Sequence, residues 1–163
     1  MNKIAIIGAE THHVEGCLPI LADSILGTYF EPKLAKSILS EGQRNHELFI
    51  ALKDSAVVGF YLMAKTGAFL VFPYLHLLAV KTSERGQGIG VLLLDHFETL
   101  NFDAEGYPFR PKVFLLVSSE NLAAVKFYQR QGYSKKAEFD DMFGEGDTEL
   151  LMMKDLGMKK KTW

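Results

Sequence analysis

The sequence lacks the residues on which small secreted proteins and most metal sites depend. It has one cysteine, Cys17, in 163 residues, which excludes an internal disulfide and favours a reducing compartment. We expect Cys17 to be a small buried side chain on a helix. The adjacent His12 and His13 have no Cys or His partners at zinc-ligand spacing, so we expect them to be solvent-exposed and the protein to hold no metal.

Long apolar runs and a strong net charge are also missing. No run is long enough to span a bilayer, and the N-terminal one is too short for a signal peptide, so we expect a cytoplasmic protein. Eighteen Lys plus Arg against 20 Asp plus Glu give a net charge of -2, which offers no global attraction to nucleic acid or an anionic membrane. An anion site must therefore be built locally.

The composition and the hydrophobic pattern fit one globular domain with a mixed α/β sheet. We expect this single domain over residues 1–156 and a short basic tail over residues 157–163. The order of elements is one strand, two helices, three strands, a helix, a strand, a helix and two strands. The predicted strands cover residues 3–7, 47–52, 56–64, 74–80, 112–117, 133–139 and 149–156, and the predicted helices cover 14–26, 32–39, 88–100 and 120–132.

A glycine-rich turn, "RGQGIG" at residues 85–90, leads from a predicted strand into a predicted helix. Glycine permits positive φ and close approach of a ligand to the backbone. The first N–H groups of a helix have no intrahelical acceptor and lie at the positive end of the helix dipole, so such a turn can bind phosphate oxygens. Two other phosphate motifs are excluded, because no Gly-Lys-Ser/Thr follows at P-loop spacing and the glycines do not fit GxGxxG.

The spelling Arg85-x-x-Gly88-x-Gly90 after "LLAV" resembles the acetyl-CoA signature of the GCN5-related N-acetyltransferase (GNAT) superfamily. A second block, "SSENLAAVKFYQRQGYSKKAEF", is similar to that family's strand, helix and Gly-aromatic segment, with Tyr128 and Gly132 at matching positions. The resemblance implies an α+β fold with a mostly antiparallel central sheet of about six or seven strands and about four flanking helices. One departure is the first turn, where many members have an Arg and this chain has Gly8.

The resemblance also implies a site for acetyl-CoA as co-substrate. The pantetheine arm would pair with the strand backbone, and one N–H there would face the thioester carbonyl and stabilise the oxyanion by about 3 kcal/mol. The implied pyrophosphate-binding residues are Arg85, Gly86, Gln87, Gly88, Ile89, Gly90 and Val91. The implied pantetheine residues are Leu78, Ala79 and Val80, with Leu78 as the oxyanion donor. On the second block, Asn121, Ala124 and Tyr128 share one helix face by their spacing and would meet the cofactor.

Catalysis needs an acid for the departing thiolate and a route for the amine proton. In the family, the tyrosine at the position that matches Tyr128 protonates the thiolate. Phenol and thiol pKa values of about 10 and 8.5 are close enough for this proton transfer. Where several members have a glutamate base, this chain has Tyr74. His76, two residues along the strand, is the best replacement, because side chains alternate and an imidazole titrates near neutral pH. Glu120, Ser118 or a water chain are alternatives.

The acceptor is an amine of open identity, either a small molecule or a protein amino group. Tyr29, Phe30 and Tyr74 are candidate acceptor-binding residues, although core packing explains Tyr29 and Phe30 equally well. The exposed edges of the sheet would allow a homodimer to form. Besides an N-acetyltransferase, two hypotheses remain: a CoA-binding regulatory module without turnover, favoured by the missing strand carboxylate, and a nucleotide-phosphate binder.

Overall fold

The element order along the chain is the predicted one. The computed structural model describes residues 4–102 and 111–157. Its strands are β1 (Ala5–Gly8), β2 (Leu48–Lys53), β3 (Ala56–Ala68), β4 (Phe72–Val80), β5 (Lys112–Ser118), β6 (Ser134–Asp140) and β7 (Thr148–Asp155). Its α-helices are α1 (Val14–Ala22), α2 (Pro32–Arg44), α3 (Ile89–Thr99) and α4 (Leu122–Arg130), and three short 3-10 turns are η1 (Thr11–His13), η2 (Ile25–Tyr29) and η3 (Thr82–Glu84).

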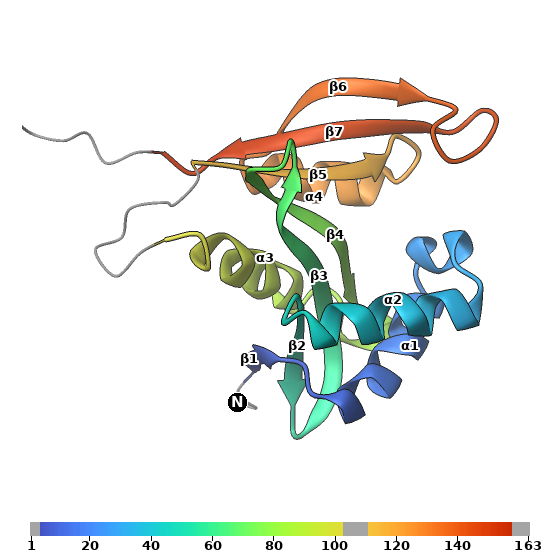
Figure 1. Cartoon of the computed structure of the whole chain (residues 1–163), viewed down its shortest axis with the longest axis vertical. Helices are drawn as coiled ribbons and strands as arrows, with labels where there is room; N and C mark the ends of the chain where they lie inside the picture. The colour runs from blue at the N-terminus through green and yellow to red at the C-terminus, as the bar shows by residue number, and fades with distance from the viewer. Residues whose placement is uncertain (1–3, 103–110, 158–163) are drawn as a thin grey trace, which may run out of the picture. The chain divides into compact units, whose positions relative to one another are not determined.

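The strands form a seven-stranded sheet in the order β1-β2-β3-β4-β5-β7-β6, which confirms the expected mixed α+β fold (Figure 1). Strand β4 pairs with β5 in parallel, while β1–β2, β2–β3, β5–β7 and β6–β7 are antiparallel. The chain divides into two compact units, one of Met1–Ala64 with His76–Phe97 and one of Lys65–Leu75 with Glu98–Trp163. Most of the predicted basic tail, residues 158–163, lies outside the described residues.

The first unit is built around helices α1 and α2, which lie side by side in Figure 1. Helix α2 runs five residues beyond the predicted end, because Ala35, Leu39 and Gly42 continue one buried face. These helices pack on β2, β3 and the second half of β4, and Cys17 is completely buried in that core, as predicted.

Helix α1 ends four residues before the predicted Leu26. The hydroxyl of Ser24 donates to the carbonyl of Leu21 at 2.7 Å, and Ser24 has an extended backbone, so the chain leaves the helix there. The following turn η2 folds back against α1 at Gly27, where a Cβ would meet the Leu21 carbonyl oxygen at 2.4 Å. A side-chain hydrogen bond therefore ended a helix that the apolar spacing had predicted to continue.

The second unit contains the β5-β7-β6 part of the sheet, with α4 against β5. A buried ionic contact joins three of its segments: the Glu98 carboxylate accepts from Lys154 Nζ at 2.5 Å and from the Tyr133 hydroxyl at 3.1 Å. The Lys154 ammonium also lies 5.8 Å from the Tyr133 ring centroid. Both oxygens of this buried carboxylate thus have partners. No helix in the described part of the chain has the length and apolarity needed to cross a membrane.

The burial of Cys17 predicts an inert thiol. Burial raises the pKa of the Cys17 thiol to about 12, so almost none is thiolate at pH 7. A thiol-specific reagent should label native protein only at the rate at which it unfolds, and should label denatured protein at once. Rapid stoichiometric labelling of the native protein would contradict this burial.

Removing the cation from the Glu98 contact should destabilise the protein. We expect Lys154→Met to lower the free energy of unfolding by about 1 to 3 kcal/mol, because it leaves a carboxylate that is 11% exposed without its cation. The matched control is Lys112→Met, whose pair with Asp155 has side chains 38% and 52% exposed, so its loss should cost under about 1 kcal/mol. Equal effects in urea unfolding would show that the buried contact has no special role.

Candidate functional site

The glycine-rich turn has the backbone geometry that the sequence predicts. Gly86 and Gly88 have φ of +77° and +82°, a region that disfavours residues with a Cβ. A Cβ at either position would meet no protein atom within 4 Å, so open space lies beside both. Gly90 lies within the first turn of α3, where its φ is not positive. Two of the three glycines are therefore required by conformation.

The amides of residues 86–91 face no described backbone acceptor. The Leu92 amide of α3 donates to the carbonyl of Gly88, the residue just before the helix, at 3.0 Å. None of the described backbone bonds of loops and helix caps has a donor amide between Gly86 and Val91. These donors stand at the positive end of the helix dipole. Donors and open space together fit a phosphate group.

Arg85, a predicted pyrophosphate contact, is hydrogen-bonded within the protein. Its amide donates to the Thr82 carbonyl at 3.3 Å, and its side-chain Nε donates to the Val80 carbonyl at 3.1 Å. The backbone amide of Arg85 is therefore already bonded within η3, and its guanidinium holds the turn against the end of β4. The amides of residues 86–91 remain the predicted pyrophosphate donors.

Side-chain contacts hold the turn before α3. Glu84 Oε2 accepts from Lys53 Nζ at 2.6 Å and from Gln87 Nε2 at 3.1 Å. The hydrogen bond from Lys53 lowers the pKa of the Glu84 carboxyl, which keeps it ionised at neutral pH. The Gln87 side chain is therefore bonded within the protein. Only the backbone of Gln87 is left for the predicted phosphate contact.

Strand β4 presents two different faces. Pro73, Leu75, Leu77 and Ala79 are buried, whereas Tyr74, His76, Leu78 and Val80 are less so. The pairing of β4 with β5 comprises Tyr74 with Phe114 and Leu75 with Leu115, and no described pair with β5 includes Leu78, Ala79 or Val80. An extended group could therefore pair with this backbone.

The two candidate side chains on the open face of β4 belong to different units. His76 belongs to the first unit and is exposed, yet surrounding protein lowers the pKa of its imidazole, an effect that the Glu47 carboxylate opposes. The imidazole is therefore mostly neutral at pH 7. Tyr74 belongs to the second unit, where burial raises the pKa of its phenol to about 12, opposed by a hydrogen bond from the Leu116 backbone.

Helix α4 carries the second predicted group of site residues. Asn121 is its N-cap: its side-chain oxygen accepts from the Ala124 amide at 3.2 Å, so this oxygen serves the helix. Tyr128 is 8% exposed, with its ring edge-on to Phe127 and Tyr133. Burial and the nearby Tyr74 phenol raise the pKa of Tyr128 above its usual range, which keeps it a neutral phenol.

The sequence analysis missed Glu149, a buried carboxylate in β7 that is 5% exposed. Burial raises the pKa of its carboxyl, and the charge of Asp147 raises it further. Its charge also acts on the Tyr74 phenol, so Tyr128, Tyr74 and Glu149 form a connected set within the second unit. Glu149 precedes the apolar run "LLMM", and this was the one available signal.

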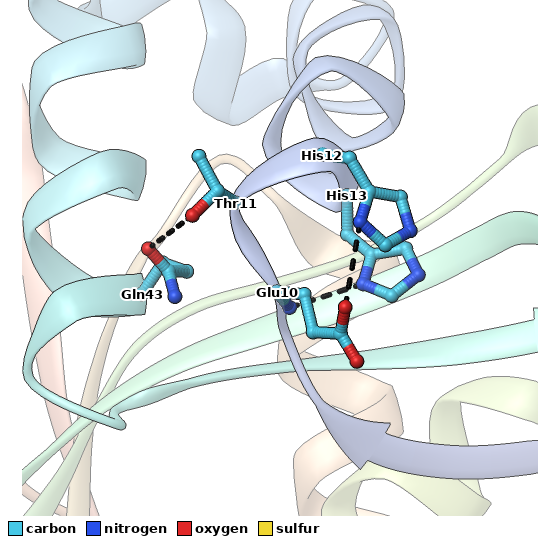
Figure 2. Close-up of polar contacts among 5 residues, drawn as sticks. All are labelled: Glu10, Thr11, His12, His13 and Gln43. Carbon is cyan, nitrogen blue, oxygen red and sulfur yellow. Dashed lines mark hydrogen bonds and ion pairs between the residues drawn. The ribbon is translucent and has the colours of Figure 1, made fainter.

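The remaining candidates have structural explanations. Phe30 packs against the core of the first unit, whereas Tyr29 is 40% exposed. Figure 2 shows the polar contacts of His12 and His13: the Glu10 amide donates to His13 Nδ1 at 3.0 Å, and His12 lies 3.5 Å from the Glu10 carboxylate. No group of three or more metal-ligating side chains occurs within residues 4–102 and 111–157.

Comparison with known proteins connects this geometry to a family. A family model described as "Acetyltransferase (GNAT) domain" matches residues 44–135, from the end of α2 into β6. This chain belongs to the GNAT acetyltransferase family. The match includes the whole glycine-rich turn and the second block as far as Lys135, with Asn121 and Tyr128 inside it.

Individual GNAT relatives are distant. The chain is 30% identical over 106 residues to an uncharacterized N-acetyltransferase of Methanocaldococcus jannaschii, a match that covers 65% of this chain and 64% of that protein. Crystallised Ard1 from Thermoplasma volcanium superposes with a TM-score of 0.78 and 21% identity, covering 94% of this chain and 98% of that one. Arabidopsis thaliana Naa50, in complex with the bisubstrate analogue CoA-Ac-MVNAL, gives 0.73 and 18%, covering 93% and 98%. These two likenesses show the fold.

Proposed function

We propose that this protein is an N-acetyltransferase that moves the acetyl group of acetyl-CoA to a primary amine within a ternary complex. The observation that carries the proposal is the turn before α3, where the amides of residues 86–91 have no described backbone acceptor beside an open space. Membership of the GNAT family supports acetyl-CoA as the anion bound there. We also propose that the protein acts in the cytoplasm.

Neutral backbone donors explain how a protein of net charge -2 binds a highly anionic cofactor. The N–H groups of residues 86–91 would donate to the pyrophosphate, with the dipole of α3 adding partial positive charge. The backbone of Leu78, Ala79 and Val80 would pair with the pantetheine arm. This role is supported by the absence of a described β5 partner for those three residues.

The chemistry is an acyl transfer. The nitrogen lone pair of the neutral amine attacks the thioester carbonyl carbon, the C–S bond breaks, and the nitrogen loses one proton as the amide forms. The Leu78 N–H would stabilise the oxyanion, and Tyr128 would give its proton to the CoA thiolate. The raised pKa of Tyr128 makes it a weaker acid than a free phenol, but burial of the thiol beside it raises the thiol pKa as well.

The amine proton has several possible acceptors among the groups that the sequence suggested. His76 is supported by the lowered pKa of its imidazole, which leaves it unprotonated at pH 7 and ready to accept. Ser118 and Glu120 lie at the end of β5, where the Glu120 amide bonds the Ser118 hydroxyl at 3.3 Å. Tyr29, Phe30 and Tyr74 remain the proposed acceptor-binding side chains.

The phosphate role of the turn predicts that a methyl group at Gly88 weakens CoA binding. We expect Gly88→Ala to lower CoA affinity about tenfold or more, because the Cβ occupies the open space and strains a positive φ. Isothermal titration calorimetry with CoA measures this change.

Gly146 provides a matched control for the Gly88 substitution. It has φ of +85° and also no protein atom within 4 Å of a built Cβ, so Gly146→Ala carries the same backbone cost of about 1 to 2 kcal/mol. Its CoA affinity should equal that of the wild type. Equal weakening in both variants would mean that strain, not phosphate contact, is the cause.

The acid role predicts that Tyr128→Phe loses turnover and keeps the cofactor. We expect kcat to fall about 100-fold while the acetyl-CoA dissociation constant changes less than about threefold. The assay is CoA thiol release with a panel of polyamines, amino acids, aminoglycosides and peptides. Tyr61→Phe removes another buried hydroxyl, one that bonds His96 Nδ1 at 2.8 Å, and should keep its turnover.

The same panel separates the enzyme from a binding module. A wild-type protein that binds acetyl-CoA and acetylates nothing across the panel would favour a CoA-binding regulatory module. Competition of ATP or NAD with CoA would favour a general nucleotide-phosphate binder. Turnover that is unchanged in Tyr128→Phe would remove its acid role and leave the transferase proposal intact.

A further inference from the structure

Glu149 is a buried carboxylate with no counter-ion among the residues that the structure describes. It is the second residue of β7, which lies between β5 and β6 in Figure 1. In the antiparallel registers Glu149 stands opposite Ser118 of β5 and Phe139 of β6, so these side chains share one face of the sheet. None of these facing residues carries a positive charge.

A comparison with Glu98 shows what Glu149 lacks. Both carboxylates are buried, at 8% and 5% exposure. Glu98 is bonded to Lys154 and to the Tyr133 hydroxyl, whereas none of the ion pairs or hydrogen bonds between described residues includes the Glu149 side chain. A buried carboxylate without a partner is costly, so its retention calls for a function.

The Glu149 carboxylate nevertheless reaches the surface. Every described side-chain oxygen or nitrogen that is shut off from solvent has a hydrogen-bond partner. Because no partner is described for the Glu149 oxygens, they must keep some access to solvent. Glu149 therefore combines low overall exposure with carboxylate oxygens that still reach solvent, and a cation that approaches from solvent would be attracted to it.

The surroundings of Glu149 connect it to the proposed chemistry. Its charge acts on the Tyr74 phenol of β4, and Tyr74 in turn acts on Tyr128 of α4, all within the second unit. The groups that bear on its titration are Asp147, in the turn before β7, and Tyr74; on β5 and β6 the facing Ser118 and Phe139 do not titrate. Burial and Asp147 raise the pKa of the Glu149 carboxyl, which makes it a stronger base than an ordinary glutamate.

We infer that Glu149 receives the acceptor's amino group: its carboxylate pairs with the entering ammonium and takes the proton that the nitrogen must lose before attack. The inference rests on the proposed transferase function and makes the acceptor a charged primary amine. The first nitrogen proton goes to Glu149 and then to solvent. After attack, Tyr128 gives its proton to the departing CoA sulfur, and the second nitrogen proton, lost as the amide forms, restores the Tyr128 phenol. The net reaction converts ammonium and acetyl-CoA into amide, CoA and one released proton.

The experiment compares the kinetics of Glu149→Gln with those of the wild type. Its substrate is the amine of the panel that the wild type acetylates most efficiently. We expect kcat/KM at pH 7 to fall about 100-fold, with the acetyl-CoA dissociation constant unchanged. The wild-type profile should rise with pH on its acidic side as Glu149 ionises. The variant should lack this limb and recover rate at alkaline pH, where more of the amine is already unprotonated. Glu138→Gln is the matched control, since Glu138 is an exposed carboxylate on β6 paired with Lys135 at 2.7 Å, and its kinetics should not change.

The melting temperature distinguishes this role from a structural one, because the two roles predict changes of opposite sign for Glu149→Gln. Because the pKa of Glu149 is raised in the folded state, the folded protein binds its proton more tightly, and the stability from this group is lost as pH rises above about 4.5. At pH 7, Glu149→Gln should therefore raise the melting temperature, and the gain should vanish at low pH. A lowered melting temperature would reveal a structural contact and overturn the inference.

A binding measurement separates failure of this inference from failure of the transferase proposal. The same amines are titrated into the wild-type and Glu149→Gln complexes with CoA, which cannot turn over. Weaker binding of amines to the variant supports the inference even if no acetylation is seen. The inference is overturned if amines bind both proteins equally or bind neither, or if the wild-type acidic limb persists in Glu149→Gln and disappears in His76→Asn.

Discussion

The hydrogen-bonding needs of a few backbone amides organise this protein. Between Gly86 and Val91 the chain leaves a strand, turns through two residues of positive φ and enters α3, so its N–H groups face outward without described backbone acceptors. Several buried contacts hold that arrangement in place. Ile89 and Leu93 of α3 are buried in the core, and Gly59 of β3 lets them approach, since a Cβ there would meet Leu93 Cδ1 at 3.1 Å and Ile89 Cγ2 at 3.4 Å. The core therefore positions donors for an anion without adding any positive side chain.

Two buried glutamates in the second unit illustrate how burial separates structural from chemical roles. Glu98 has a cation and a hydroxyl as partners, so its charge contributes to holding Tyr133 and Lys154 in place. Glu149 has neither among the described residues, and the same physical cost appears instead as a raised pKa. A desolvated carboxylate with a raised pKa is typical of sites of chemistry more than of structural contacts. Tyr128 and Tyr74 in the same unit are neutral phenols for the same reason, burial.

Hydrogen bonds to nearby backbone decided local features that the sequence-based picture did not include. Ser24 ended α1 earlier than predicted by bonding the Leu21 carbonyl, and Arg85 uses its amide and guanidinium within its own turn. Asn121 gives its oxygen to the Ala124 amide as a helix cap, and its cofactor contact stays a prediction. Apolar periodicity does not report such bonds, because they depend on backbone angles that a few polar residues decide.

The sequence by itself determined the order of elements, the family and the glycine-rich turn. Each of these depends on local spacing: alternation in strands, a repeat of 3.6 residues in helices, and glycines where φ must be positive. Only the tertiary structure distinguished Glu149 from the other carboxylates and coupled it to Tyr74 and Tyr128. That distinction arises because β7 inserts between β5 and β6, so residues far away in the chain, such as Ser118 and Tyr74, contribute to the environment of Glu149. Burial of a charge is a property of those neighbours, and no pattern along the chain contains it.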